Sequence, residues 1–577
     1  MRTAMAQLVR DDVRAAIAAA LDDAQARGAL PRLPGAEIAV ERPQKPEHGD
    51  YASSVALRLA GTVKRRPLDV AQAIADSLPT GALIAAVEVA PPGFINLRLA
   101  PDWKRAQVDA VLAAPDSWGA IDLGAGQRVQ VEFVSANPTG PLQVGNGRGA
   151  VLGDVLAGVL DAAGYEVERE YYVNDAGAQV RIFGETLAAR YAQHFGHAAE
   201  VPAGGYQGRY MVELAEAIAA ERGEEFLSLD GPARDALGAE GLRRMLDQIR
   251  GDLALLGVEF DVWFSEASLL APRDTLDGRS AYESAMTYLR DGGHVVEKEG
   301  AVWFASSARD DKDNVIVRSS GEPTYFATDI AYHFDKFALR GFDRVIDVWG
   351  ADHQGHVART KAATAAVTAA AREDGDAGDR PSGDGLEMLL YQLVHLRRGD
   401  ERVRMSKRTG ELVTLRELVE EVGRDVTRYF MLQRSADAQM DFDLELATSQ
   451  DPKQNPVSYV QYAHARCASI LRNGAKEGLQ PGGDVQALTS PSELALIDAM
   501  LRLPELVEMM ATKLEPHHLT GYALELAQDF TQFYGACRVV NAEEPDLSRA
   551  RLKLTRAAQI ALARTLGLMG VRAPDEM

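Results

Sequence analysis

The sequence predicts a multidomain α/β protein, with a doubly wound parallel sheet in the middle, an N-terminal α+β domain and a C-terminal all-α helical bundle. The chain has 577 residues, enough for about four domains, or fewer if one is a large α/β unit. Strands and helices alternate through the middle of the chain, and the last quarter is almost wholly helical. We place the three parts at residues 1–118, 128–450 and 452–577.

The N-terminal part begins with helical periodicity over residues 6–28, where apolar residues recur at helical spacing. Residues 37–41, 84–89 and 94–99 are predicted strands, the last two on either side of a Pro-Pro-Gly turn. These elements predict a compact α+β domain that ends near Trp118.

The central part follows a Gly-rich linker and has the alternation typical of a parallel sheet. Residues 200–270 are helical and charged, and we expect them to be an insertion into that sheet. Residues 372–386 are rich in Gly and Asp and predict an exposed loop. The predicted strands are 129–134, 167–172, 301–305, 344–348 and 388–396, and the predicted helices are 149–162 and 356–371.

The C-terminal part carries four long helical patterns, which predict a helical bundle. The predicted helices are 459–471, 491–510, 518–540 and 547–568.

Composition excludes several classes of protein. Only Cys467 and Cys537 occur, too few for a disulfide framework or a cysteine-based zinc site, so a reducing compartment is favoured. No apolar run approaches the ~20 residues of a membrane span. Acidic residues among the first 24 argue against a signal or transit peptide. We therefore expect a cytoplasmic protein with no membrane partner.

The negative charge is confined to the middle of the chain. The formal net charge is −22, and the segments 1–116 and 452–577 have balances of zero and −1. Residues 117–451 therefore hold 35 basic and 56 acidic residues. An acidic surface repels nucleic acid but leaves room for a local contact face, and it suits a cationic small substrate. We expect most of the excess to be solvated surface.

The first motif with chemical content is VEFVSANPTGPLQVGNGRGA, residues 131–150. A predicted strand ends near Val134, and a Gly-rich turn opens a helix, an arrangement that lets backbone N–H groups approach a phosphate. A dinucleotide fingerprint also fits Gly145, Gly147 and Ala150, so a nicotinamide-dependent oxidoreductase is one alternative. That fingerprint should follow its strand directly, whereas ten residues separate Val134 from Gly145.

The second motif is RMSKRTG, residues 404–410. Its cationic side chains surround a serine on a short loop, as suits the stabilisation of a departing pyrophosphate in nucleotidyl transfer. Taken alone, such a cluster is equally typical of a solvated basic loop.

Together the two motifs resemble those of class I aminoacyl-tRNA synthetases. Residues 143–146 occupy the place of that family's HIGH motif, and residues 404–408 the place of its KMSK motif. Further motifs resemble bacterial arginyl-tRNA synthetases over nearly the full chain. They are PEHGDYASSVALRLA, SANPTGPL, YYVNDAGAQV, TYFATDIAYH, WGADH and NPVSYVQYAHAR.

The resemblance implies a Rossmann-like catalytic domain at 128–450, a tRNA-binding accessory domain at 1–118 and an anticodon-binding domain at 452–577. It implies ATP-dependent ligation of L-arginine to tRNA(Arg) through an arginyl-adenylate. ATP would be a substrate and would bring Mg²⁺, held mainly through its phosphates, with no metal site of the protein's own. We expect a monomer.

The resemblance also implies an arginine pocket. A guanidinium is a planar fork of five donors that pairs with carboxylates, and an α-ammonium also needs acceptors. The residues at the family's positions supply acids, an amide and a phenol. They are Glu132, Ser135, Asn137, Tyr325 and Asp329, with Asp352 as the candidate from WGADH.

The chain departs from the family pattern where both HIGH histidines are replaced, by Gln143 and Asn146. An amide keeps the ability to donate hydrogen bonds but cannot take a positive charge. A non-catalytic tRNA-binding paralogue is therefore a second alternative. The remaining implied residues are Gly145, Gly147, Met405 and Ser406 for ATP, and Arg404, Lys407 and Arg408 for the transition state and pyrophosphate.

In the C-terminal part, the resemblance implies that one helix presents Tyr459, Tyr462 and Arg466 to the anticodon loop. Aromatic side chains stack on unpaired bases and arginine contacts phosphate. The spacing of the two tyrosines is equally consistent with core packing. We expect Phe530, Phe533 and Tyr534 to be core.

Overall fold

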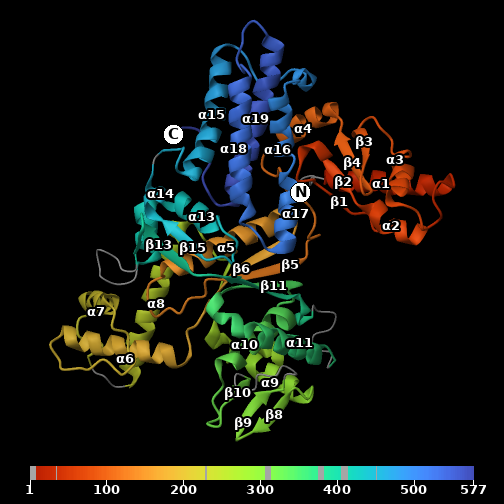
Figure 1. Cartoon of the computed structure of the whole chain (residues 1–577). Coiled ribbons are helices and arrows are strands. Elements are labelled where there is room, and N and C mark those ends of the chain that lie inside the picture. Colours follow the sequence, from red (N-terminus) through yellow and green to blue (C-terminus); the bar gives the residue numbers. More distant parts are fainter. Residues whose placement is uncertain are drawn as a thin grey trace.

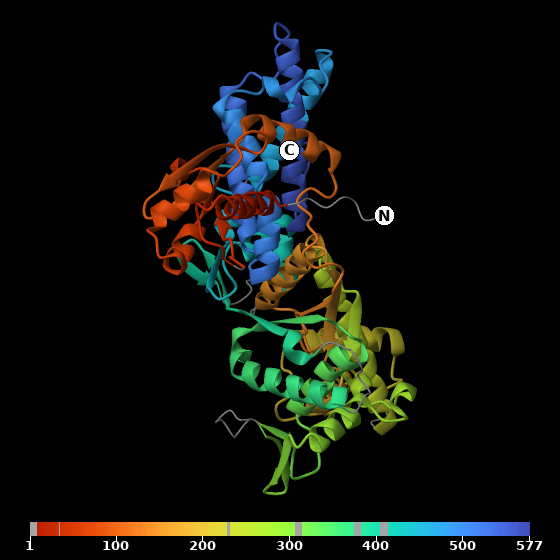
Figure 2. The same ribbon diagram turned by 90° about the vertical axis from the view of Figure 1, so that its right-hand side faces the viewer.

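A computed structural model describes residues 8–33, 35–227, 231–305, 314–373, 382–403, 413–449 and 451–577. The predicted loop at 404–408 lies outside these ranges. The molecule is elongated, with the C-terminal helices at one end and a small antiparallel sheet at the other (Figures 1 and 2). The N-terminal domain lies beside the C-terminal helices.

The N-terminal domain packs three helices on a four-stranded antiparallel sheet of order β1-β2-β4-β3. The predicted strand 37–41 shortens to two residues, because only those two pair with β2. The elements are α1 (Val9–Ala26), β1 (Val40–Glu41), β2 (Tyr51–Ser53), α2 (Val55–Val63), α3 (Pro67–Ala75), β3 (Ile84–Ala90) and β4 (Phe94–Leu99).

A five-stranded parallel sheet of order β12-β11-β5-β6-β7 forms the centre and confirms the predicted doubly wound fold. Helix α5 covers one face, while α10 and α11 cover the other (Figure 1). The strand order reverses between β5 and β11, where such sheets bind ligands at the carboxyl ends of the strands. The elements are β5 (Arg128–Phe133), α5 (Val144–Ala162), β6 (Glu166–Val173), β7 (Val262–Ser265), α10 (Tyr325–Phe334), β11 (Arg344–Gly350), α11 (Val357–Glu373) and β12 (Leu386–Tyr391).

The predicted insertion at 200–270 was partly wrong. It holds α7 (Arg209–Arg222) and α8 (Gly231–Leu256), which pack on α6 (Gly177–His194), but it also contains β7 of the parallel sheet. A four-residue edge strand is too short to stand out against the helical pattern around it.

Two further predicted strands were misplaced. Residues 301–304 form β9 (Ala301–Phe304) in a separate antiparallel sheet with β8 (Val295–Lys298) and β10 (Val315–Val317). The predicted strand 388–396 divides at Gln392–Leu393 into β12 and β13 (Val394–Arg398), where the chain leaves the parallel sheet. Strand β13 pairs with β14 (Glu401–Val403) and β15 (Met440–Asp443).

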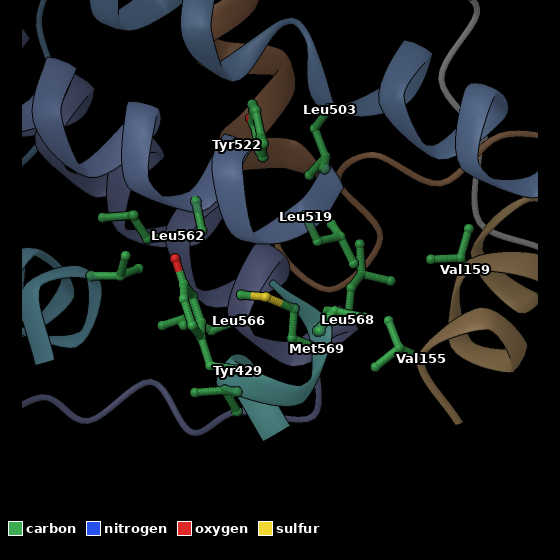
Figure 3. Close-up of a cluster of buried hydrophobic side chains, with 14 of the residues drawn as sticks. Val155, Val159, Tyr429, Leu503, Leu519, Tyr522, Leu562, Leu566, Leu568 and Met569 are labelled. Carbon is green, nitrogen blue, oxygen red and sulfur yellow. The ribbon is translucent and has the colours of Figure 1, made fainter. Parts of the chain in front are cut away.

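Three short helices, α12 (Leu415–Val422), α13 (Arg424–Leu432) and α14 (Leu444–Thr448), lead to the C-terminal bundle. The predicted helix 491–510 is two helices that divide at Leu501–Arg502. Val155 and Val159 of α5 lie close to Leu503, Leu519 and Leu568 (Figure 3), so bundle and sheet share one core. The helices are α15 (Pro456–Lys476), α16 (Pro491–Met500), α17 (Leu503–Lys513), α18 (His518–Ala536) and α19 (Pro545–Leu568).

Ion pairs join the N-terminal domain to α16 and α17. Arg10 pairs with Glu508 at 2.6 Å and Arg42 with Glu505 at 2.7 Å. On α4 (Pro101–Ala113), Lys104 lies between Asp50 and Asp498 at 2.7 and 2.9 Å. Among the helices in the described ranges, none is long and apolar enough to cross a membrane.

Candidate active site

The candidate site begins where β5 leaves the sheet. Val134 and Ser135 both take positive φ angles, 68° and 41°, a conformation that is strained for side chains other than glycine and concentrates at functional sites. This turn brings the Ser135 hydroxyl back to donate a hydrogen bond to Glu132. The same oxygen accepts a hydrogen bond from the Tyr172 backbone N–H at 3.1 Å. The strained turn therefore fixes both Glu132 and Ser135.

Glu132 lies in a row of three buried carboxylates. It is in register with Asp347 on β11 and with Glu170 on β6, so all three side chains lie on one face of the sheet. Their exposed fractions are 5%, 0% and 0%. We call Asp347, Glu132 and Glu170 the carboxylate row.

Glu132 and Asp347 differ in how readily they ionise, because their pKa values are shifted in opposite directions. Burial and the nearby Asp347 charge raise the pKa of Glu132 to about 7, against the influence of Lys336. Burial would also raise the pKa of Asp347, but Lys336 and His333 lower it to about 2. Glu132 is therefore poised to take a proton near neutral pH unless a cation binds beside it.

Helix α10 brings two more of the residues predicted to bind the substrate arginine, Tyr325 and Asp329, to this face. Tyr325 is 48% exposed at the start of the helix, and an added Cβ on Gly177 would lie 3.8 Å from its hydroxyl. One turn later, burial raises the pKa of Asp329. The sequence motif TYFATDIAYH therefore places an accessible phenol and a proton-prone carboxylate on one helix.

Glu266 is a candidate that the sequence analysis missed. It follows β7, is 4% exposed, and its Oε2 has no hydrogen-bond partner within the described residues. Burial, together with the charges of Asp329 and Asp175, raises the pKa of Glu266 to about 7, although the nearby hydroxyl groups of Thr328 and Tyr172 lower it. The only signal in the sequence was an acid directly after a strand, and β7 itself was not predicted.

The remaining two residues predicted to bind the substrate arginine, Asn137 and Asp352, lie nearer the surface. Asn137 is exposed, and its amide donates to Gln179 Oε1 at 2.7 Å. The Asp352 side chain is 78% exposed and pairs with His353 at 3.6 Å. The structure therefore does not bury Asp352 with the other acids.

The predicted phosphate site lies at the start of α5, which begins five residues earlier than predicted. The glycines are part of the helix because the packing requires them. An added Cβ on Gly147 would lie 2.7 Å from Leu415, and one on Gly149 would lie 2.8 Å from Tyr391. A Cβ on Gly145 would meet nothing within 4 Å, so only Gly145 faces open space.

The two HIGH-motif replacements form the start of this helix. Asn146 Oδ1 accepts a hydrogen bond from the Gln143 backbone N–H at 2.9 Å, and Gln143 Nε2 donates to the Pro141 carbonyl at 3.2 Å. Gln143 Oε1 is buried without a partner in the described part of the chain. Each amide therefore keeps N–H capacity beyond these bonds.

A cavity of about 300 Å³ adjoins the helix start. Strands β13 and β14 form its opposite side, and it is lined by Gln143, Val144, Gly145, His395, Val403 and Val413 among others. The predicted residues Arg404, Met405, Ser406, Lys407 and Arg408 lie outside the described residues. Val403 and Val413, which line the cavity, lie on either side of that undescribed segment.

An aromatic cluster with arginine lies on α15 and α18. The Arg466 guanidinium lies 5.0 Å from the Tyr462 ring and 5.5 Å from the Tyr534 ring. Both tyrosines are about two-fifths exposed, at 41% and 42%. The expectation that Tyr534 is core was wrong, whereas Phe530 and Phe533 are buried as expected. Tyr459 instead donates its hydroxyl to Thr531 at 3.1 Å.

Three family models match the chain in order. They are described as "Arginyl tRNA synthetase N terminal domain" over residues 11–99, "tRNA synthetases class I (R), catalytic domain" over 107–448, and "DALR anticodon binding domain" over 460–577.

Individual proteins agree with these models. The chain is 48% identical to the arginine--tRNA ligase of Dehalococcoides mccartyi (strain CBDB1), covering 99% of both. It is 45% identical to that of Carboxydothermus hydrogenoformans, covering 93% of this chain and 94% of the relative. Among solved structures, the Thermus thermophilus arginyl-tRNA synthetase superposes with a TM-score of 0.73 at 25% identity, covering 99% and 100%. A putative arginyl-tRNA synthetase from Campylobacter jejuni gives 0.72 at 30% identity, covering 83% and 100%.

Proposed function

This chain belongs to the arginyl-tRNA synthetase family, and from that membership we propose which of its residues carry out the family's reaction. The chain ligates L-arginine to tRNA with ATP through an arginyl-adenylate. The relatives lend no support to a non-catalytic paralogue, and a nicotinamide-dependent oxidoreductase would leave the anticodon-binding domain without a role.

The acids around β5 and α10 bind arginine in this proposal. The supporting observation is that Glu132, Asp329 and Glu266 are drawn toward protonation by burial, with their pKa values raised. A cationic ligand would supply the missing countercharge. Glu132 lies on the strand that leads into α5, so we assign it, with Ser135 and Asn137, to the α-ammonium at the reacting end.

The guanidinium is then assigned to the second group of acids. Asp329, Glu266 and Tyr325 are near one another. The charge of Asp329 raises the pKa of Glu266, and the charge of Glu266 raises the pKa of Tyr325. Two carboxylates and a phenol match the five-donor fork of a guanidinium better than the single ammonium of lysine. We leave Asp352 as an outer residue of the site because its side chain is largely exposed.

ATP is assigned to the cavity beside α5. The helix start offers backbone N–H groups to phosphate at Gly145, and the spare N–H capacity of Gln143 and Asn146 replaces that of the histidines. Gly147 is needed for helix packing in addition to any role near ATP. Arg404, Lys407 and Arg408 would stabilise the departing pyrophosphate, with Met405 and Ser406 shaping their loop.

Magnesium would accompany ATP, held through the phosphates. Within the described ranges, no group of three or more His, Cys, Asp or Glu side chains could hold a metal ion. Tyr462, Arg466 and Tyr534 would meet the anticodon loop, with Tyr459 supporting them. We further propose domain limits of 1–118, 128–450 and 452–577, tRNA(Arg) as partner, a monomeric state and a cytoplasmic location.

The test is aminoacylation of total tRNA with a panel of amino acids, together with arginine-dependent pyrophosphate exchange in the presence of tRNA. We expect arginine alone to be charged. Glu132→Gln should raise the KM for arginine at least 100-fold, since breaking a buried ion pair costs about 3–5 kcal/mol, while the KM for ATP changes little. At saturating arginine, kcat should show no histidine-like ionisation from residues 143 and 146. Charging of another amino acid in preference to arginine would overturn the assignment.

A further inference from the structure

The carboxylate row has fixed cations at its two ends and none at its centre. Asp347 receives Lys336 Nζ and His333 Nε2, both at 2.8 Å. At the other end, Glu170 accepts hydrogen bonds from Arg340, one of them at 3.0 Å, and from the Tyr332 hydroxyl. Within the described residues Glu132 has no ion pair, and its side-chain partner is the Ser135 hydroxyl.

The cations at both ends come from one segment. Tyr332 belongs to α10, which continues directly as a π-helical turn, Asp335–Leu339, ending at Arg340. Tyr332, Lys336 and Arg340 recur every four residues and therefore share one side of this segment. Helical turns of the π type are rare and are frequently found at functional sites.

Lys336 is held in place on all sides. Its side chain is 0% exposed, and its ammonium lies 4.0 Å from the centre of the Tyr332 ring. Arg340 is shared with Asp335, whose carboxylate lies 2.8 Å from its Nε. Lys336 is thus fully buried, whereas Arg340 is 22% exposed and is held by Glu170 and Asp335. Both end acids of the row are therefore paired within the protein.

We propose that Lys336 and Arg340 are positioning residues which neutralise Asp347 and Glu170, and so reserve the central Glu132 for the ammonium group of the amino-acid substrate. The proposal rests on the assignment of arginine to Glu132. This arrangement explains why three acids can be adjacent in a sheet interior. Two of them are paired with cations of the protein, and the third is neutralised by the ammonium group of the substrate. Without Lys336, the adjacent carboxylates of Glu132 and Asp347 would share a proton instead.

Protonation of Glu132 is the quantity to measure, and several elements face it. Strand β11 contributes Asp347, and β6 contributes Glu170, Tyr171 and Tyr172. The α10 segment contributes Lys336 and Tyr332, and β12 contributes Tyr391. His333 acts on Asp347 and so acts on Glu132 indirectly, and Asp347 in turn acts on Asp329.

The experiment follows the KM for arginine between pH 6 and 9 in pyrophosphate exchange with tRNA present. In the parent enzyme the KM should fall as pH rises through about 7, where Glu132 becomes ionised. Lys336→Met removes a positive charge, so the midpoint should move up by at least one unit. That shift gives a roughly five-fold higher KM at pH 7, where Glu132 of the parent is already about half protonated, and a nearly ten-fold higher KM at pH 6, since one pKa unit is a factor of ten.

A substitution of the neighbouring acid, Asp347, should shift the midpoint in the opposite direction. Asp347→Asn should move the midpoint down and remove the pH dependence of KM between pH 6 and 8. The double variant, with Lys336→Met and Asp347→Asn together, loses one charge of each sign and should return the midpoint close to that of the parent. A purely structural role for Lys336 predicts that the double variant is at least as impaired as either single one.

Lys104→Met is the matched control. Lys104 is also a largely buried lysine between two carboxylates, but it joins the N-terminal domain to α16, so its variant should keep the parent pH profile of the arginine KM. Equal midpoints in the parent, Asp347→Asn and double variants would overturn the proposal even if Lys336→Met failed to fold. A parent enzyme that does not charge arginine would instead overturn the proposed function.

Discussion

Replacing Glu266 by glutamine should stabilise the free protein and weaken its binding of arginine. The Glu266 carboxylate is 4% exposed, and its Oε2 has no partner in the described part of the chain. Burial of an unpaired charge destabilises the folded state, and a neutral amide of the same shape removes that penalty. A residue that destabilises the free protein but binds substrate is typical of an active site.

The magnitude follows from the pKa of Glu266. Burial raises it to about 7 from an ordinary value of 4.5, a difference that corresponds to roughly 3 kcal/mol. The buried amide keeps some desolvation penalty of its own, so the net gain should be about 1–2 kcal/mol. Because the folded-state pKa is raised, the parent carries no penalty below about pH 4.5. The penalty grows between pH 4.5 and 7 and is complete above pH 7.

Thermal unfolding of the parent and of Glu266→Gln at pH 5.5 and pH 8, with and without arginine, measures this. The variant should unfold at a higher temperature at pH 8, with a smaller difference at pH 5.5. Saturating arginine should stabilise the parent more than the variant, and the KM for arginine should rise ten-fold or more. Glu493→Gln is the control, because Glu493 is buried but paired with Arg551 at 2.7 Å. That variant should be less stable than the parent and keep its arginine KM.

Two results would refute this reasoning. One is a Glu266→Gln variant less stable than the parent at pH 8 in the absence of arginine. The other is an unchanged KM for arginine, which would mean that Glu266 lies beside the substrate without contacting it.

Two further predictions concern other parts of the chain. Tyr534→Ala should raise the KM for tRNA about 5- to 150-fold, from the ~1–3 kcal/mol of a base stacked on an aromatic ring, with little change in thermal unfolding. Phe533→Ala, which removes a fully buried neighbour, should lower stability instead. An unchanged tRNA KM in Tyr534→Ala would exclude the contact. The other prediction concerns Arg148, which is 0% exposed and donates hydrogen bonds to the carbonyls of Gln392, Ala438 and Ser435 at 2.7–2.8 Å. Arg148→Met should therefore lower the free energy of unfolding by about 3–5 kcal/mol. Denaturant unfolding measures this loss, and a loss below about 1 kcal/mol would contradict the prediction.

Local patterns predicted the parts of the site that lie within one motif. The strand, turn and helix of residues 131–150 correctly located Glu132 and Ser135 at the end of β5. The start of α5 was placed too late because glycine disfavours helix, whereas contacts with Leu415 and Tyr391 require glycine there. Those partners are more than 240 residues away in the sequence, and no local pattern contains them.

Residues that enter the site through sheet register could not be predicted. Glu170 lies in the predicted strand 167–172, and no local pattern links it to Glu132. Its place beside Glu132 depends on the pairing of β5 with β6. The prediction that Tyr534 is a core residue was wrong for a related reason. Its spacing from Phe530 suggests one buried helix face, but the bundle covers Phe530 and leaves Tyr534 42% exposed. Helical periodicity identifies which residues share a face but does not show how wide the covered stripe is.

The buried acids also revise the interpretation of the charge distribution. The acid excess of residues 117–451 was expected to be mostly solvated surface. Among the described residues of that block, seven acids are buried against three bases, Arg148, Lys336 and Arg428. The acids are Glu132, Glu170, Asp252, Glu266, Asp335, Asp347 and Asp425. A part of the excess therefore lies in the interior.

This placement bears on how one domain can serve two oppositely charged substrates. An exposed cluster of carboxylates that attracted arginine would also repel the phosphates of tRNA. In the carboxylate row, Lys336 and Arg340 neutralise the two outer acids at distances of 2.8 and 3.0 Å. Bound arginine would neutralise the central one. Once the amino acid is bound, the row presents little net charge to an approaching acceptor end, so arginine binding itself removes the electrostatic obstacle to tRNA at this site.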